Sequence, residues 1–292
     1  MKKIFATLLL AASFTAQAQE YKRIEGCIVN EDGNAVEFVT VGIMGKGTGT
    51  VSSASGHFSL KIPATGNDTI TFSHVSYGKK EIAAKELLGS GTPLTVRMHT
   101  RELKEITVFS GKRKKAKLAN RGMRVKGAKT MWTPANIGNE IGSIIESKRT
   151  FDVEEIRFRV QSNAIDSLKL SINIYRTGEE TGSLANILQR PIYVNIPTSP
   201  QKQEIAIAPK EVIRLDAGRY YVSVKFVHCS EEAQKEWQDE ESWDNKKRYE
   251  MSKKSIFFPL FLKAGYIRNG AVAEPEKIPM NLGLEVIGYE YR

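Results

Sequence analysis

Apolar and polar residues alternate in short runs along the first third of the chain, and turn signals separate the runs. Val39, Val41 and Ile43 share one face of one such run, and Asp32-Gly33 precedes it as a tight-turn pair. No window here keeps a helical period over three turns. The pattern predicts a small β-sandwich, with strands expected at 23–29, 38–44, 58–62, 68–73 and 92–98.

The same alternation returns in the last 160 residues. Ile156, Phe158 and Val160 alternate with charged residues, and Asp216-Ala217-Gly218 is a strong turn signal before a further run. One polar and one apolar face on most runs is typical of an antiparallel sandwich. The fold class is therefore predicted as all-β, with a larger, jelly-roll-like second sandwich. Its expected strands are 154–161, 168–175, 191–196, 203–207, 219–227, 255–262 and 282–291.

The first sandwich carries a spaced set of residues that points to a family. It resembles the carboxypeptidase-regulatory-like (transthyretin-like) domain of Gram-negative envelope proteins over residues 20–99. The resemblance implies a non-catalytic accessory module, which lends a fold and not an activity. Ser53 stands where that family often has Asp, which argues against a calcium site in this loop. The residues that carry the resemblance are Gly26, Ile28, Gly33, Val39, Val41, Gly49, Thr50, Gly56, Phe58, Ser73 and Tyr77.

A short segment after this module extends the resemblance. Leu103, Glu105, Ile106 and Val108 are similar to the segment that follows the same accessory domain in TonB-dependent outer-membrane receptors. The remaining chain is too short for the plug and barrel of such a receptor, so we expect neither. The segment is either a TonB-contacting strand or, as we prefer, an edge strand or linker.

The N-terminus predicts export. A basic start, an apolar run over 4–14 and Ala16-Gln17-Ala18 indicate a signal peptide at 1–18. An exported protein of 292 residues then divides into a module at 19–100, a linker at 101–130 and a second sandwich at 131–292. We expect it in the periplasm or associated with the outer membrane.

The positive charge of the chain is concentrated in one stretch. Formal net charge is +10, and the segment 101–130 holds 11 basic residues against two glutamates. Few large apolar residues accompany them, which is typical of a flexible linker. It is read either as a solvated tether or as a contact to a membrane or another polyanion. It lacks interleaved aromatic residues, so nucleic acid is not expected. The candidate contact residues are Lys112, Arg113, Lys114, Lys115 and Lys117.

A polar insertion at 230–251 contains unexpected aromatic rings. Acidic residues at its front and basic ones behind favour a short helix or lid. Trp237, Trp243 and Tyr249 either face a ligand, for which a sugar is the natural choice, or pin the insertion to the sandwich. Trp132 is interpreted as a packing residue.

No catalytic motif stands out. The four histidines occur singly, and no nucleophile elbow, phosphate-binding loop or dinucleotide fingerprint is present. Asp239, Glu240 and Glu241 adjoin one another, unlike the separated pair of a glycosidase. Cys27 and Cys229 are expected as two separate thiols more often than as a disulfide. We therefore expect no metal, no cofactor and no enzyme.

Two functions remain open from the sequence. The first is a non-catalytic exported envelope protein that binds a protein partner, an outer-membrane receptor or an anionic surface. The second is a carbohydrate-binding or carbohydrate-active protein that uses the C-terminal sandwich.

Overall fold

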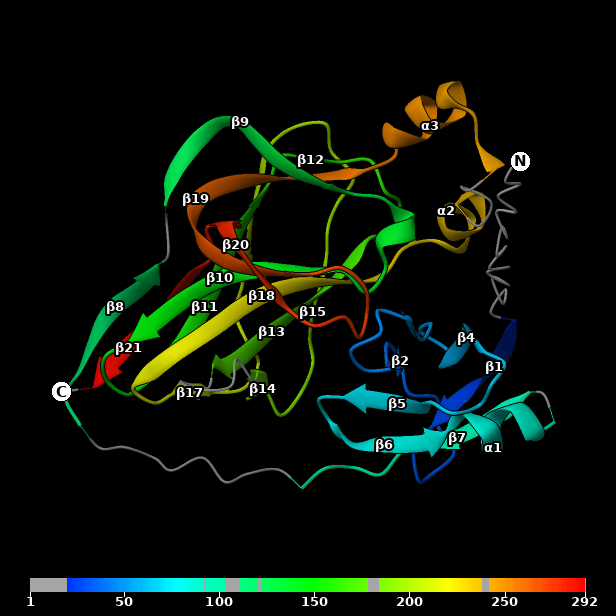
Figure 1. Cartoon of the computed structure of the whole chain (residues 1–292). Helices are drawn as coiled ribbons and strands as arrows, with labels where there is room; N and C mark the ends of the chain where they lie inside the picture. Colours follow the sequence, from blue (N-terminus) through cyan, green and yellow to red (C-terminus); the bar gives the residue numbers. More distant parts are fainter. Residues whose placement is uncertain are drawn as a thin grey trace, which may run out of the picture.

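A computed structural model describes residues 20–91, 93–102, 111–119, 122–177, 184–237 and 242–291. Most of these residues lie in β-strands, and the strands form two separate bodies (Figure 1). The all-β prediction is confirmed. Among the helices of these residues, none has the length and apolar character needed to cross a membrane.

The N-terminal body is a sandwich of two small sheets. One has the order β4-β1-β7, with β1 (Tyr21–Val29) antiparallel to β4 (His57–Pro63) and parallel to β7 (Leu94–Arg97). The other has the order β3-β2-β5-β6, formed by β3 (Gly49–Val51), β2 (Thr40–Gly42), β5 (Thr69–His74) and β6 (Tyr77–Ala83). A short helix, α1 (Ala84–Gly89), follows. The buried residues between the sheets include Ile28, Val41, Phe58, Ile70 and Phe72.

The larger body packs a nine-stranded sheet on a five-stranded one. The first has the central order β12-β19-β10-β18-β13-β14, from β12 (Ser162–Asn163), β19 (Ile256–Arg268), β10 (Glu140–Ser147), β18 (Gly218–His228), β13 (Lys169–Thr177) and β14 (Leu184–Asn186). Further pairs are made by β15 (Ile192–Asn195), β20 (Glu276–Asn281) and β9 (Met123–Trp132). The second has the order β16-β11-β21-β8, from β16 (Gln203–Ile207), β11 (Phe151–Val160), β21 (Glu285–Tyr291) and β8 (Arg113–Ala119), with β17 (Ile213–Leu215) beside β11.

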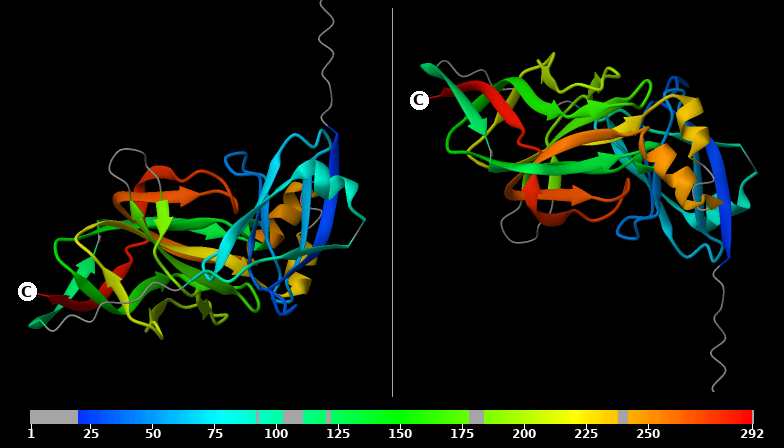
Figure 2. Two further views of the ribbon diagram at one scale, coloured as in Figure 1. Left: turned by 90° about the horizontal axis from the view of Figure 1, so that it is seen from below. Right: turned by 90° about the horizontal axis from the view of Figure 1, so that it is seen from above.

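The insertion at 230–251 is helical where it is described. It forms α2 (Glu231–Glu236) and α3 (Asn245–Ser252), each with a side-chain cap from Ser230 or Asp244. Both helices lie on the side of the larger body that faces the N-terminal sandwich (Figure 2). A single-turn helix, η1 (Pro134–Asn136), follows Trp132. Trp132 is buried between Phe226 and Phe258, so it is a packing residue as predicted.

The basic stretch corrects the expectation of an open linker at 101–130. Over 113–119 and 123–132 it forms β8 and β9, which pair with β21 and β19 on different sheets. Ala116 and Leu118 pack against the core of the larger body. An alternation of cations with small apolar residues therefore folds as a strand, because a neighbouring strand satisfies its backbone. The larger sandwich thus begins before residue 131.

Some predictions fall outside the described residues. The signal peptide at 1–18, the receptor-like segment over 103–110 and the acidic residues Asp239, Glu240 and Glu241 all lie there. Both cysteines are described and are free, and Cys229 is buried. Burial raises the pKa of the Cys229 thiol to about 12, with a smaller contribution from Asp166.

The two bodies are joined through the outer face of β18 and the side of the N-terminal sandwich nearest to it. Phe38 is 4% exposed, yet it packs outside its own core, with Val51, Val227 and Ala271. Its ring meets Tyr193 edge-on at 5.0 Å. Its φ of 53° is unusual for a residue with a side chain. Such strain persists only where surrounding contacts hold it, which makes Phe38 the anchor of the interface.

A histidine at the end of β5 adds a polar contact across the same interface. The backbone N–H of Ser76 donates to His74 Nδ1 at 3.3 Å, so the imidazole proton resides on Nε2. His74 Nε2 then donates to Tyr193 OH at 3.2 Å. Burial lowers the pKa of His74 to about 4, and the charge of Lys225 lowers it further. The interface is thus built for neutral imidazole.

Replacing Leu118 by Ala tests whether β8 is part of the fold. A half-buried leucine should contribute about 1–2 kcal/mol to the free energy of unfolding, less than a fully buried one. Chemical denaturation measures the difference. Lys114→Ala, on an exposed position of the same strand, is the matched control and should change stability by less than about 0.5 kcal/mol. Equal, negligible effects of both substitutions would restore the linker interpretation.

Acid should weaken the interface between the bodies. The unfolded chain takes up a proton at His74 near pH 6.5, whereas the native state does so only near pH 4, so stability falls as pH drops through this window. The loss should approach about 3 kcal/mol at the acidic end. Thermal unfolding from pH 7 to 4.5 should therefore show a shallower pH dependence in His74→Gln than in the parent chain. His228, whose pKa burial also lowers, should be replaced in a parallel variant. An unchanged slope in His74→Gln would contradict this account.

Candidate functional site

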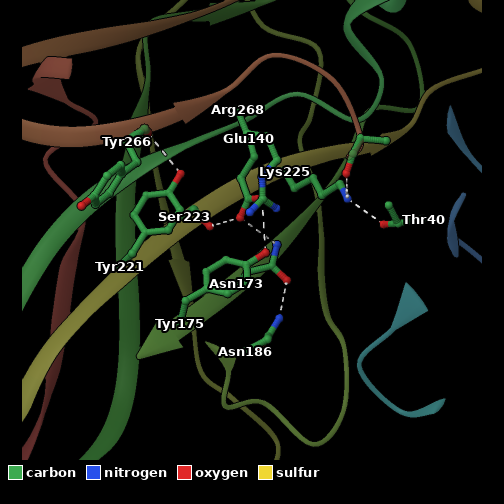
Figure 3. A network of polar contacts seen from close by, with 11 residues as sticks. Thr40, Glu140, Asn173, Tyr175, Asn186, Tyr221, Ser223, Lys225, Tyr266 and Arg268 are labelled. Atoms are coloured by element: carbon green, nitrogen blue, oxygen red, sulfur yellow. Dashed lines mark hydrogen bonds and ion pairs between the residues drawn. The ribbon is translucent and has the colours of Figure 1, made fainter. Parts of the chain in front are cut away.

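A carboxylate with no exposure to water lies at the centre of the larger sheet. Glu140 is 0% exposed and opens β10, between Arg268 of β19 and Lys225 of β18, its register partners on either side. Figure 3 shows these side chains on the face of the sheet turned away from the sandwich core. Alternation along each strand fixes this placement, because inward positions on β18 are apolar and outward ones are Tyr221, Ser223 and Lys225.

Every strand around Glu140 contributes a hydrogen-bond donor to it. Arg268 Nη1 donates at 3.0 Å, Tyr175 OH at 3.3 Å and Asn173 Nδ2 at 3.4 Å, and Ser223 Oγ donates as well. Asn186 Nδ2 extends the network by donating to Asn173 Oδ1 at 3.1 Å. Buried charge is tolerated only when it is paired and hydrogen-bonded in this way. Burial, and next the nearby Glu140, raises the pKa of Tyr175 above its usual range.

Lys225 carries the network to the other body. Its Nζ donates to Thr40 Oγ1 in β2 at 2.7 Å and to the Ala271 carbonyl at 3.5 Å. Burial lowers the pKa of Lys225 to about 8, while Glu140 opposes the shift. The side chain is 7% exposed and fully engaged, so this amine is not placed to attack a substrate. The network is structural, and its output is the position of the N-terminal sandwich.

Beyond Val227 the interface opens into a groove of about 550 Å³. Its N-terminal wall is the outward, polar face of β1 and β4, where Arg23 Nη1 donates to Ser59 Oγ at 2.8 Å and Ser59 Oγ donates to Glu25 at 3.1 Å. Its opposite wall comes from the larger body. A groove between domains with mixed donors and acceptors is a usual place for a ligand. The second wall contains Ile137, Val227, His228 and Gln234.

The residues proposed from sequence lie elsewhere. Trp237 and Trp243 are half-buried and pack edge-to-face on each other, 4.9 Å between ring centroids. Tyr249 is 67% exposed on α3, with Lys253 Nζ 4.7 Å from its ring centroid. Their role toward a ligand stays a prediction. Neither these rings nor the basic residues of β8 line the groove.

The basic residues of β8 are largely engaged with the larger body. Lys115 pairs with Glu154 at 3.2 Å, Lys117 pairs with Glu285 at 2.7 Å, and the Arg113 guanidinium lies 4.5 Å from the Tyr289 ring centroid. Lys112 and Lys114 are exposed. The described residues hold no cluster of three or more His, Cys, Asp or Glu side chains suited to a metal ion.

Replacing Glu140 by Gln should destabilise the larger body by about 3–5 kcal/mol, because Arg268 and Lys225 would be left buried without a counter-charge. Equilibrium denaturation of the full chain measures the loss. The double variant Glu140→Gln/Lys225→Met removes one orphaned cation and should recover part of it. Glu154→Gln, which breaks an exposed pair, should cost less than about 1 kcal/mol. A cost for Glu140→Gln as small as that of Glu154→Gln would contradict the central role of this carboxylate.

The comparisons with known proteins bear mainly on the N-terminal body. No curated protein matches the chain in sequence. Two solved structures of infectious bursal disease virus are similar at 9% identity: the T13 viral particle, with a TM-score of 0.25, and the Gx strain, with a TM-score of 0.27. The alignments cover 93% of this chain but 58% and 60% of the viral chains. At these TM-scores the likeness carries no argument.

A family model matches residues 24–108, and its description is CarboxypepD_reg-like domain. The match includes β1 to β7, so it covers the N-terminal sandwich and the wall that this sandwich contributes to the groove. The known members' domain is a β-sandwich module, which agrees with the fold observed here. The chain is therefore a carboxypeptidase-regulatory-like domain protein, with the family domain at residues 24–108.

Proposed function

We propose that this protein is a non-catalytic, exported protein of the cell envelope, and that it binds a protein partner in the groove between its two sandwiches. The observation that carries the proposal is the groove itself, which has one wall from each body. The match to a regulatory-like domain is compatible with a binding role. The signal peptide predicted at 1–18 supports export.

The groove is suited to a polypeptide because its lining is mixed in character. Arg23, Glu25 and Ser59 supply charge and hydroxyl groups on one side, and Gln234 supplies an amide on the other. Backbone amides and carbonyls of a partner need donors and acceptors together. The buried contacts of Phe38 and Lys225 hold the two walls in place before binding, which reduces the entropy that binding costs.

A carbohydrate is the second candidate, favoured by the same row of hydrogen-bonded polar groups at Arg23, Ser59 and Glu25. Hydroxyl-rich ligands use such groups as donors and acceptors. The aromatic rings proposed from sequence lie outside the groove, so a sugar there would be held by polar contacts.

A photo-crosslinking amino acid placed at His57 and, separately, at Gln234 tests the proposal on opposite walls. In cells that produce the exported protein, both positions should capture the same envelope protein. Lys246, exposed on α3 and outside the groove, is the control position and should not capture it. Recovery of glycan from both walls would replace the protein partner by a carbohydrate. The same products at Lys246, or none at either wall, would contradict the groove as the binding site.

Once the partner is purified, Ser59→Trp should lower its affinity at least about tenfold, because an indole would fill the groove from an exposed position. Lys246→Ala should leave the affinity unchanged. Melting temperatures of both variants should match the parent, which separates blocked binding from unfolding. Retained affinity in a folded Ser59→Trp protein would rule the groove out.

A further inference from the structure

A second cavity, of about 260 Å³, lies at the lateral edge of the larger sandwich, apart from the groove between the bodies. It opens between β9 and β19 of the nine-stranded sheet and β11 and β16 of the five-stranded one. None of its lining residues belongs to the N-terminal sandwich. Its chemistry therefore stands independently of the function proposed above.

Three cations from three strands of the chain converge on this cavity. Arg124 comes from β9, Arg159 from β11, and Lys202 directly precedes β16. The only carboxylate in the lining is Glu204, whose oxygens lie 3.4 Å from Arg159 Nε and 4.0 Å from Arg157 Nη1. Within the described part of the chain, Arg124 and Lys202 have no ion-pair partner. The lining thus carries three positive charges against one negative charge.

This contrasts with the rest of the basic stretch to which Arg124 belongs. Lys115 and Lys117 are neutralised by glutamates of β11 and β21. Cations that surround a common recess repel one another more strongly than on an open surface, because less water screens them. An anion in the recess removes that repulsion and accepts several charge-assisted hydrogen bonds.

The floor of the cavity is apolar. Val160, Pro259 and Phe261 line it and are buried. Phe261 is the register partner of Arg124, so ring and guanidinium lie side by side across β19 and β9. Gly283, with a φ of 62°, packs against this ring, and a Cβ there would lie 2.7 Å from it. The ring is thus held in a fixed place, next to the cations.

We propose that this cavity binds a phosphate monoester carried by a compact ring or apolar group. The phosphate contacts Arg124, Arg159 and Lys202, and the attached group packs on Phe261. The net charge of +2 in the lining matches a phosphate dianion, and guanidinium groups fit phosphate oxygens in pairs. The volume is near the lower end of small-ligand pockets, so the attached group is small.

Calorimetric titration of the full chain with phenyl phosphate, at pH 7.5 and low salt, tests the proposal. One molecule should bind per chain. Inorganic phosphate, which lacks the ring, should bind about fivefold or more weakly, and benzyl alcohol, which lacks the charge, should show no saturable binding at the same concentrations. Binding should weaken as salt rises and as pH falls below about 6, where the monoester loses its second charge.

Variants assign the binding to this cavity. Arg124→Gln and Lys202→Gln should each weaken phenyl phosphate binding about tenfold, the loss of a charged hydrogen bond. Lys246→Gln removes the same charge from α3 and should leave it unchanged. All of these positions are exposed, so melting temperatures should be preserved. Absence of saturable binding, equal weakening in Lys246→Gln, or equal affinity for inorganic phosphate would overturn the proposal.

Vesicles separate the two sources of such a phosphate. Sedimentation with vesicles of phosphatidic acid in phosphatidylcholine, compared with phosphatidylcholine alone, should be repeated with the Arg124→Gln/Lys202→Gln chain. Sedimentation lost in that variant supports the cavity with a lipid headgroup as the source of the phosphate. No sedimentation, together with phenyl phosphate binding, supports it with a soluble ester. Vesicle binding that survives in the variant would overturn a lipid phosphate in this cavity.

Discussion

The fold of the larger body depends on neutralising one buried carboxylate. Glu140 has no contact with water, so an unpaired charge there would cost more than most single interactions supply. The solution is distributed over four strands: Arg268 and Lys225 flank it in register, and side chains of β13 and β18 fill its remaining acceptor sites. A slip of β10 by one residue would turn Glu140 into the apolar core. The charge therefore fixes the register of the sheet.

The same constraint determines where the regulatory-like domain sits. Outward side chains of β18 run from Tyr221 beside the network, through Lys225, to Val227 at the interface cluster. Lys225 reaches Thr40 of the family domain, and two residues further Val227 packs on Phe38. One strand thus links the buried charge, the docked domain and the groove. Because β18 is held on both sides by β10 and β13, the groove wall formed by His228 inherits that rigidity.

Local pattern predicted the strands that have one wet face and one dry face. β4, β11 and β16 alternate plainly, and each was expected within a few residues of its place. β10 was missed because both of its faces are buried, so Glu140, Gly142 and Ser143 interrupt any alternation. β8 and β9 were missed because their cations suggested a linker, whereas their partners β21 and β19 lie more than 100 residues away in the chain. Pairing over such distances leaves no local signal.

The sites were harder to foresee than the strands. Glu140 and Arg268 are separated by 128 residues, and no spacing rule relates them. Gly49 offered a partial signal. Three closely spaced glycines predicted unusual backbone, and Gly45 and Gly47 do have positive φ, but Gly49 is in β3 and allows Val272 of the other body to approach. Sequence showed that glycine was needed there and could not show which neighbour required it.

Charge in this protein is best understood by asking what pays for its desolvation at each place. Glu140 is balanced by cations that the fold itself supplies, and the result is architecture. Lys115 and Lys117 are balanced by glutamates on neighbouring strands, which ties a basic stretch into the sandwich. Arg124 and Lys202 face a recess whose one carboxylate is already shared by two arginines. A protein that neutralises its other cations so consistently leaves these to be balanced from outside. The unpaired charge is therefore where a ligand, and not the fold, completes the structure.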